Sequence, residues 1–156
     1  MLAKCDLAHK TALITGASSG IGRAMAVRLA ESGMNLALSG RSLERLEETA
    51  RLTGRPQDML LLPGELSGLA AVEALLQETL AHFGGLDVLI NNAGMALNCP
   101  FEAISESDYD RIMLLNAKIP FLLCQKALPL LRRSDSPTII NIGSVVAHSG
   151  YAFQAA

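Results

Sequence analysis

Apolar and polar positions along the chain fall into two kinds of block. Short apolar runs bounded by glycine or polar residues are typical of parallel strands that are buried on both faces. Between these runs, apolar residues recur at helical spacing and mark the buried stripe of a helix. The expected strands are residues 10–15, 34–39, 59–63, 86–91 and 138–143, and the expected helices are residues 21–33, 43–52, 70–83 and 105–133.

Residues suited to helix ends stand at several of these boundaries. Ser42, Ser67 and Ser105 can each act as the N-cap of the helix that follows. Gly33 and Gly84 suit the left-handed position after a last helical turn. Strands that alternate with helices predict an α/β fold, a doubly wound, mostly parallel, Rossmann-like sheet of five strands with flanking helices.

Composition narrows the class of protein. A chain of 156 residues without a linker or repeat is expected to form one domain. Half of the residues are hydrophobic and the mean hydropathy is +0.32, which indicates extensive burial rather than disorder. The net charge of -2, without a cluster of lysine and arginine, argues against nucleic acid as a partner.

Cysteine usage and hydropathy also bear on location. Cys5, Cys99 and Cys124 lack the spacing of a disulfide framework or a zinc site, so we expect free thiols in a reducing compartment and no metal. No stretch resembles a signal peptide, and no apolar run has membrane-spanning length. We therefore expect a cytoplasmic protein without a membrane partner.

The sequence TGASSGIG joins the first strand to the first helix, where free backbone N–H groups and the positive helix end favour a phosphate. Gly16 allows the sharp turn, Gly20 lets the backbone approach a pyrophosphate, and Gly22 lets helix and sheet pack closely. Ser18 and Ser19 add hydroxyl donors. The spacing matches neither GxGxxG nor GxxxxGK[ST], so a turn with a purely structural role stays an alternative.

Four motifs in order resemble those of the short-chain dehydrogenase/reductase family. They are TGxxxGIG from Thr15, NNAG from Asn91, Asn116, and NIGS ending at Ser144. The resemblance extends from about Lys10 to the end of the chain. It implies a single NADP(H)-binding domain over residues 1–156, and an oxidoreductase that transfers a hydride between a nicotinamide dinucleotide and an alcohol or carbonyl substrate. In full-length relatives the long helix pairs across a twofold axis, which implies a homo-oligomer for the full-length protein and leaves the state of residues 1–156 open.

The end of the second strand bears on the choice of cofactor, because it meets the adenosine ribose in such folds. Gly40 leaves room there, and the Arg41 guanidinium can hold a 2'-phosphate, whereas a carboxylate would repel it. NADP(H) is therefore favoured over NAD(H). The alternative is that Arg41 faces water or pairs with Glu44 or Glu48. A methyltransferase would carry an acidic residue at this strand end, so that class is disfavoured.

The resemblance also implies contacts along the rest of the cofactor. Glu65 and Leu66 stand where the family has an Asp-Val pair near the adenine. The small residues of NNAG allow backbone to lie against the nicotinamide half, with Asn91 bridging cofactor and sheet and Asn92 open to a structural role. The expected cofactor-binding residues are Gly16, Ser18, Ser19, Gly20, Ile21, Gly22, Arg41, Glu65, Leu66, Asn91, Ala93 and Gly94.

Two residues correspond to the family's catalytic set. By resemblance, the Ser144 hydroxyl hydrogen-bonds the substrate oxygen; the alternative is a serine that satisfies backbone groups. Asn116 lies four residues before Pro120, which has no N–H, so the Asn116 carbonyl lacks its helical donor and the helix kinks. In the family that carbonyl holds a water of the proton relay; the alternative is an Asn that faces solvent.

The family's acid is a tyrosine in a YxxxK motif that lies further on than the twelve residues after Ser144. Tyr151 and His148 are not assigned that role. We expect this chain to bind a dinucleotide but to lack the catalytic tyrosine and lysine, with the fifth strand left as an apolar edge. The alternative function is a non-catalytic dinucleotide-binding or interaction protein that naturally ends here.

Overall fold

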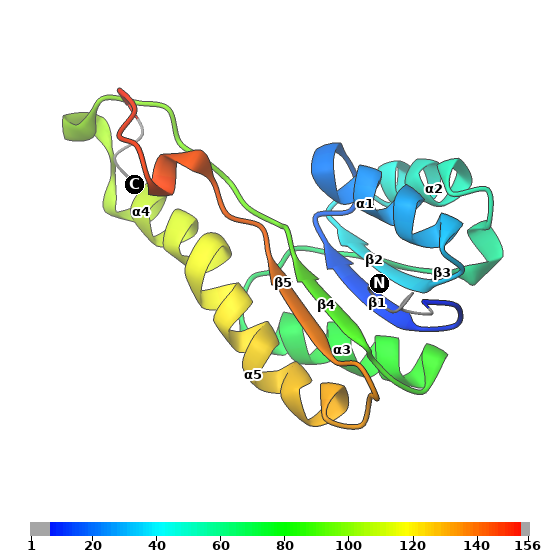
Figure 1. The fold of residues 1–156 in the computed structure, drawn as a ribbon. Coiled ribbons are helices and arrows are strands. Elements are labelled where there is room, and N and C mark those ends of the chain that lie inside the picture. The colour runs from blue at the N-terminus through cyan, green and yellow to red at the C-terminus, as the bar shows by residue number, and fades with distance from the viewer. Residues whose placement is uncertain (1–6, 154–156) are drawn as a thin grey trace, which may run out of the picture.

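The computed structural model describes residues 7–153, so Cys5 lies outside the described part of the chain. Strands and helices alternate as the sequence pattern predicts (Figure 1). The strands are β1 (Thr11–Thr15), β2 (Asn35–Gly40), β3 (Met59–Pro63), β4 (Val88–Asn91) and β5 (Thr138–Asn141). The helices are α1 (Gly20–Glu31), α2 (Leu43–Leu52), α3 (Leu69–Phe83), α4 (Glu106–Met113) and α5 (Ile119–Leu131).

The strands form one parallel sheet in the order β3-β2-β1-β4-β5. The chain moves outward from β1 to β3, then returns to pair β4 with the other side of β1. This reversal makes the sheet doubly wound, and the fold expected from the sequence is confirmed. The reversal also leaves a crevice between the ends of β1 and β4, where ligands bind in sheets of this kind.

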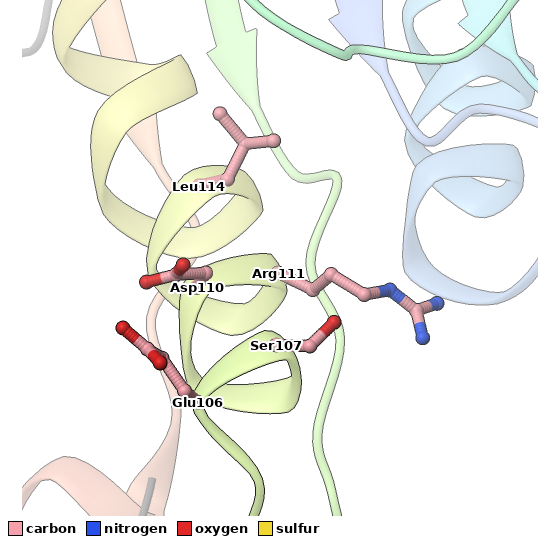
Figure 2. A pocket seen from close by; sticks show the side chains of 5 residues that line it. All are labelled: Glu106, Ser107, Asp110, Arg111 and Leu114. Carbon is pink, nitrogen blue, oxygen red and sulfur yellow. The ribbon is translucent and has the colours of Figure 1, made fainter.

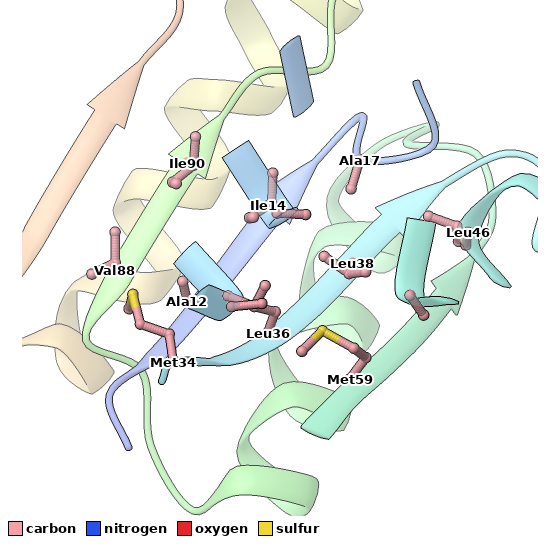
Figure 3. Packing of buried hydrophobic residues seen from close by; sticks show 13 residues of the cluster. Ala12, Ile14, Ala17, Met34, Leu36, Leu38, Leu46, Met59, Val88 and Ile90 are labelled. Carbon is pink, nitrogen blue, oxygen red and sulfur yellow. The ribbon is translucent and has the colours of Figure 1, made fainter. Parts of the chain in front are cut away.

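Helices cover both faces of the sheet, as Figure 1 shows. On one face, α1 and α2 pack against Ala12, Ile14 and other apolar residues of the first core cluster (Figure 3). On the other face, α3 and α5 pack against Leu13 and Leu89. Successive residues of a strand point to opposite faces, which explains why β1 needs an unbroken apolar run.

The helix ends largely follow the capping signals. Ser42 accepts a hydrogen bond from the Arg45 amide at 3.3 Å, and Ser105 forms a capping box with Asp108. Gly33 and Gly84 have φ angles of 83° and 77°. The N-cap predicted at Ser67 is wrong: Gly68 occupies that position, and α3 begins at Leu69 without a side-chain cap.

The long helical run contains an irregular turn. Residues Leu114–Lys118 form a π-helix between α4 and α5, closed by a hydrogen bond from the Ile119 amide to the Leu114 carbonyl. Pro120 follows at the start of α5 and supplies no N–H, which fits the local disturbance expected around Asn116. The sequence therefore located the distortion, although not its π-helical form.

One helical run in the described residues, Glu106–Leu131, has the length and apolar composition to cross a membrane. Core helices of water-soluble proteins meet the same criterion. Here Ile119, Leu123, Ala127 and Leu131 are buried within the second core cluster, so this face of the helix packs against the protein.

The edge of the sheet at β5 is open. β5 pairs with β4 on one side, and no described strand pairs with its other side. Its residues are exposed, including Ile139 and Ile140. The apolar edge expected from the sequence is therefore present in the described structure.

Candidate functional site

A cleft of about 740 Å³ opens at the carboxyl ends of the strands, beside the crevice between β1 and β4. It takes its walls from the turn before α1, the end of β2, the segment after β3, the segment after β4, and the long helix. Its lining residues are Gly16, Ser18, Ser19, Gly20, Ile21, Ser39, Gly40, Arg41, Gly64, Glu65, Leu66, Ser67, Asn92, Ala93, Gly94, Met95, Arg111, Leu114 and Leu115.

Most of the predicted cofactor residues meet in this cleft. Gly22 and Asn91 are the exceptions, because neither lines it. The sequence did not single out several other lining residues for this site, among them Met95, Arg111, Leu114 and Leu115. These side chains come from segments whose approach to the cleft depends on tertiary packing, so no local sequence signal marks them.

The three glycines of the turn are needed for different structural reasons. A Cβ on Gly22 would lie 2.3 Å from the Gly16 carbonyl oxygen, so only glycine lets α1 approach the turn this closely. Gly16 has a φ of 68° and is crowded by Asn92 and Ala93. Gly20 has a φ of 54° and faces open space within 4 Å, which leaves its backbone free to approach a ligand.

Asn92 joins the two strand ends that frame the crevice. Its Nδ2 donates to the carbonyls of Thr15 at 2.9 Å and Gly16 at 3.2 Å. The Thr15 hydroxyl accepts from the amides of Asn92 and Ala93, both at 3.0 Å. The structural role left open for Asn92 is therefore supported, and the side chain also lines the cleft.

Arg41 stands at the end of β2 without an ion pair among the described residues. Glu48, one of the partners considered for it, pairs with Arg23 at 2.7 Å instead. A Cβ on Gly40 beside it would lie 3.1 Å from Ser18, closer than most real Cβ contacts. The Arg41 guanidinium is exposed and lines the cleft, where it is available to an anion.

Asn91 lies inside the sheet rather than in the cleft. Its Nδ2 donates to Asn141 Oδ1 at 2.8 Å and contacts Cys124 Sγ at 3.4 Å. Its Oδ1 is buried and has no hydrogen-bond partner in the described structure. The side chain thus links the ends of β4 and β5.

Asn116 reaches the cleft only through a neighbour. Its Oδ1 accepts from the Met95 amide at 2.9 Å, and its Nδ2 donates to the Met95 carbonyl at 2.7 Å. Met95 lines the cleft, whereas Asn116 does not. Asn116 is exposed, as the alternative expected, but its side chain is also tied to the loop after β4.

Ser144 lies beyond β5, at the start of the short helix Val145–Ala147. Its Oγ accepts from the Val146 amide at 3.4 Å, and the residue is exposed and outside the cleft lining. His148 and Tyr151 are likewise exposed and outside it. The segment that follows turns back to the loop after β4, where the Cys99 amide donates to the Phe153 carbonyl at 3.0 Å.

A smaller hollow of about 340 Å³ lies on α4 and shares Arg111 and Leu114 with the cleft. In Figure 2 the Arg111 side chain extends to the opposite side of the helix from Glu106 and Asp110. Arg111 forms no ion pair within the described residues. The cleft thus carries two guanidinium groups, Arg41 and Arg111, against one carboxylate, Glu65.

No group of side chains suited to a metal ion occurs among the described residues. The carboxylates with shifted pKa values lie outside the cleft. Burial opposes the ionisation of Asp87, but hydrogen bonds from Ser134 and the Thr11 amide, together with Lys10, leave its pKa below the ordinary value. Hydrogen bonds from Ser105 likewise lower the pKa of Asp108.

A family model described as short chain dehydrogenase matches residues 10–156. The chain belongs to the short-chain dehydrogenase family. Members of this family are oxidoreductases that use nicotinamide dinucleotide cofactors and act on small-molecule substrates.

Individual relatives of this short-chain dehydrogenase agree with that assignment. A 3-oxoacyl-(acyl-carrier-protein) reductase FabG from Staphylococcus aureus is 37% identical over 148 residues. A hydroxynaphthalene reductase-like protein Arp2 from Metarhizium anisopliae is 33% identical over 157 residues. Among solved structures, a short-chain dehydrogenase/reductase (glucose/ribitol dehydrogenase) from Brucella melitensis superposes with a TM-score of 0.90 at 31% identity.

These comparisons cover most of this chain but only part of each relative. The matches include 94% of the chain for both curated proteins and 96% for the solved structure. The chain spans 60% of the FabG protein, 58% of the Arp2 protein and 62% of the solved chain.

Proposed function

We propose that the protein is an NADP(H)-dependent oxidoreductase that exchanges a hydride between the nicotinamide and an alcohol or carbonyl substrate. The observation that carries the proposal is the Arg41 guanidinium, which lines the cleft beside Gly40 and has no carboxylate partner among the described residues. A guanidinium can hold a phosphate through two parallel hydrogen bonds, which favours a 2'-phosphorylated cofactor over NAD(H).

Different cleft residues would contact different parts of such a cofactor. The turn before α1 offers free backbone N–H groups at a helix N-terminus, which favour a pyrophosphate. Gly22 and Asn91 would support the site from outside the cleft. Bound there, the cofactor would supply the hydride chemistry. The proposed lining contacts are Gly16, Ser18, Ser19, Gly20, Ile21, Arg41, Glu65, Leu66, Ala93 and Gly94.

Ser144 and Asn116 are the proposed catalytic residues. In this role the Ser144 hydroxyl donates a hydrogen bond to the substrate oxygen. The Asn116 backbone carbonyl, left without the N–H of Pro120, would hold a water that carries a proton. The side-chain bonds from Asn116 to Met95 support this role, because they connect the irregular helical turn to a cleft-lining segment.

Further features support the wider proposal. The two curated relatives bear the names of reductases, which favours carbonyl reduction by this protein.

The long helix carries exposed apolar residues, which supports a homo-oligomer. They are Met113, Phe121 and Leu128. We place residues 1–156 in a single NADP(H)-binding domain and the protein in the cytoplasm, consistent with its acidic net charge and free thiols.

Titration calorimetry with NADPH tests the proposal directly. Saturable binding, competed by adenosine 2',5'-bisphosphate, is expected, because that compound carries the 2'-phosphate that Arg41 would hold. Binding should also stabilise the fold by about 2.7 kcal/mol at a hundredfold excess over the Kd. A folded protein that binds no nicotinamide dinucleotide would contradict the proposal. Residues 1–156 alone are expected to bind without reducing a carbonyl, so reduction is assayed on a protein that also carries the family's YxxxK motif. Binding without reduction by that protein would favour the non-catalytic alternative.

A further inference from the structure

Arg23 of α1 connects the glycine turn to α2. Its Nη2 donates to the Ser18 carbonyl and to the Glu48 carboxylate, each at 2.7 Å, and its Nε donates to the Thr49 hydroxyl at 3.0 Å. The Arg23 side chain is only 24% exposed. The Arg28 side chain, on the same helix, is 83% exposed, and Glu31 is its one partner within residues 7–153.

Thr49 contacts the same turn at Ala17, the residue before Ser18. This buried threonine of α2 has its Oγ1 3.0 Å from the Ala17 carbonyl and 3.0 Å from the Arg45 carbonyl. A hydroxyl donates one hydrogen at a time, so the Ala17 and Arg45 carbonyls share the Thr49 hydroxyl as their donor. Two consecutive carbonyls of the turn are therefore held by side chains that approach from the α2 side.

Fixing these carbonyls also fixes the amides. All described peptide bonds are trans, so each carbonyl points opposite to the N–H of the next residue. The carbonyls of Ala17 and Ser18 bond away from the cleft, which turns the N–H groups of Ser18 and Ser19 the other way. Both serines line the cleft, and neither amide has an acceptor in the described structure.

We infer that Arg23 and Thr49 are positioning residues for a phosphate-binding turn. From outside the cleft they hold the peptide planes so that the Ser18 and Ser19 amides face a phosphate of a dinucleotide bound in the cleft. Glu48 holds the Arg23 guanidinium in place. None of the three lines the cleft, so they act through the turn and not on the ligand. The inference rests on the proposed dinucleotide site and deepens it.

The test compares Arg23→Met, Thr49→Val and the control Arg28→Met by titration with NADPH and with NADH at a temperature where each variant is fully folded. Arg23→Met and Thr49→Val should each weaken both nucleotides by about tenfold, as expected for the loss of one or two hydrogen bonds that orient the turn. Thr49→Ser, which keeps the hydroxyl, should restore binding, and Arg28→Met should bind as the wild type does.

The outcomes separate the inference from the proposed function. A lower Tm with wild-type Kd values would reduce Arg23 and Thr49 to structural residues and overturn the inference alone. Failure of the wild-type protein to bind either nucleotide would overturn the proposed function and the inference with it. If Arg23→Met does not fold, Thr49→Val carries the test with Thr49→Ser as its matched control, and a wild-type Kd in Thr49→Val would overturn the inference.

Discussion

The Asn116 carboxamide and the Met95 backbone exchange two hydrogen bonds, one at 2.9 Å and one at 2.7 Å. The pair joins the π-helical turn of the long helix to the loop that follows β4. Because Met95 lines the cleft, the bonds hold one cleft wall to a helix that is anchored in the core.

Removal of this pair should loosen the loop. In Asn116→Ala, loss of the two hydrogen bonds should lower the free energy of unfolding by roughly 1–2 kcal/mol. The higher helix propensity of alanine should offset about 0.5 kcal/mol of this, which leaves a net loss of about 1 kcal/mol. Hydrogen exchange of the Met95 amide should accelerate at least about tenfold, since its acceptor is gone.

Asn98→Ala is the matched control. Asn98 lies in the same loop, is exposed, and forms no side-chain hydrogen bond with the described residues. Its replacement should leave the exchange of Met95 unchanged. Equal exchange rates in the wild type and in Asn116→Ala would show that the pair does not hold the loop.

The pKa of Asp87 predicts a pH-dependent contribution to stability. Its folded value lies below the unfolded one, so the contribution is complete above about pH 4 and is lost as the pH falls through the folded pKa. Asp87→Asn should therefore lower the free energy of unfolding by roughly 1–3 kcal/mol at pH 7, the range for hydrogen bonds to a charged group. Urea unfolding at pH 7 and pH 3 measures the difference, which should shrink at pH 3.

Asp110→Asn serves as the control for this titration, because Asp110 is exposed and forms no hydrogen bond or ion pair through its side chain within the described residues. It should change stability little at either pH. A wild-type advantage over Asp87→Asn that is equally large at pH 3 would contradict the assignment of the effect to the ionised carboxylate.

Gly22→Ala tests the close approach of α1 to the turn. Alanine favours a helix over glycine by about 1 kcal/mol, yet its Cβ would lie 2.3 Å from a backbone oxygen and 2.6 Å from Asn92 Nδ2. The overlap should dominate, with a net destabilisation of about 1–3 kcal/mol in denaturant unfolding and a weaker NADPH complex. Gly85→Ala meets nothing within 4 Å and should leave stability equal or slightly higher. Equal stability of Gly22→Ala and the wild type would refute the packing argument.

The elements of the fold could be predicted because their signals are local. Buried runs such as β1 and caps such as Ser105 depend on residues that are neighbours in sequence. The cap at Ser67 failed since Gly68, with a φ of 154°, supplies a backbone geometry that competes with a side-chain cap. Such competition within one residue of a helix start is not visible in a pattern of residue types.

The site could be predicted only in part. The glycine turn and Arg41 follow strands directly, and the topology brings them to one edge. The bonds from Asn116 to Met95 and from Asn91 to Asn141 join residues 21 and 50 positions apart, so they arise from tertiary packing. Asn91 was expected to bridge cofactor and sheet; the register of β4 and β5 brings its side chain to Asn141 within the sheet, and its contact with the cofactor stays a prediction.

The most direct test of the central claim is the ratio of the Kd values for NADH and NADPH in the wild type and in Arg41→Glu, measured by fluorescence titration. The wild type should prefer NADPH, and charge reversal should reduce the ratio at least about tenfold, because a charge-assisted bond to the 2'-phosphate becomes a repulsion. Arg51→Glu, which reverses an exposed charge in the last turn of α2, should keep the wild-type ratio. No NADPH preference in the wild type, or the same preference after reversal at Arg41, would contradict the account.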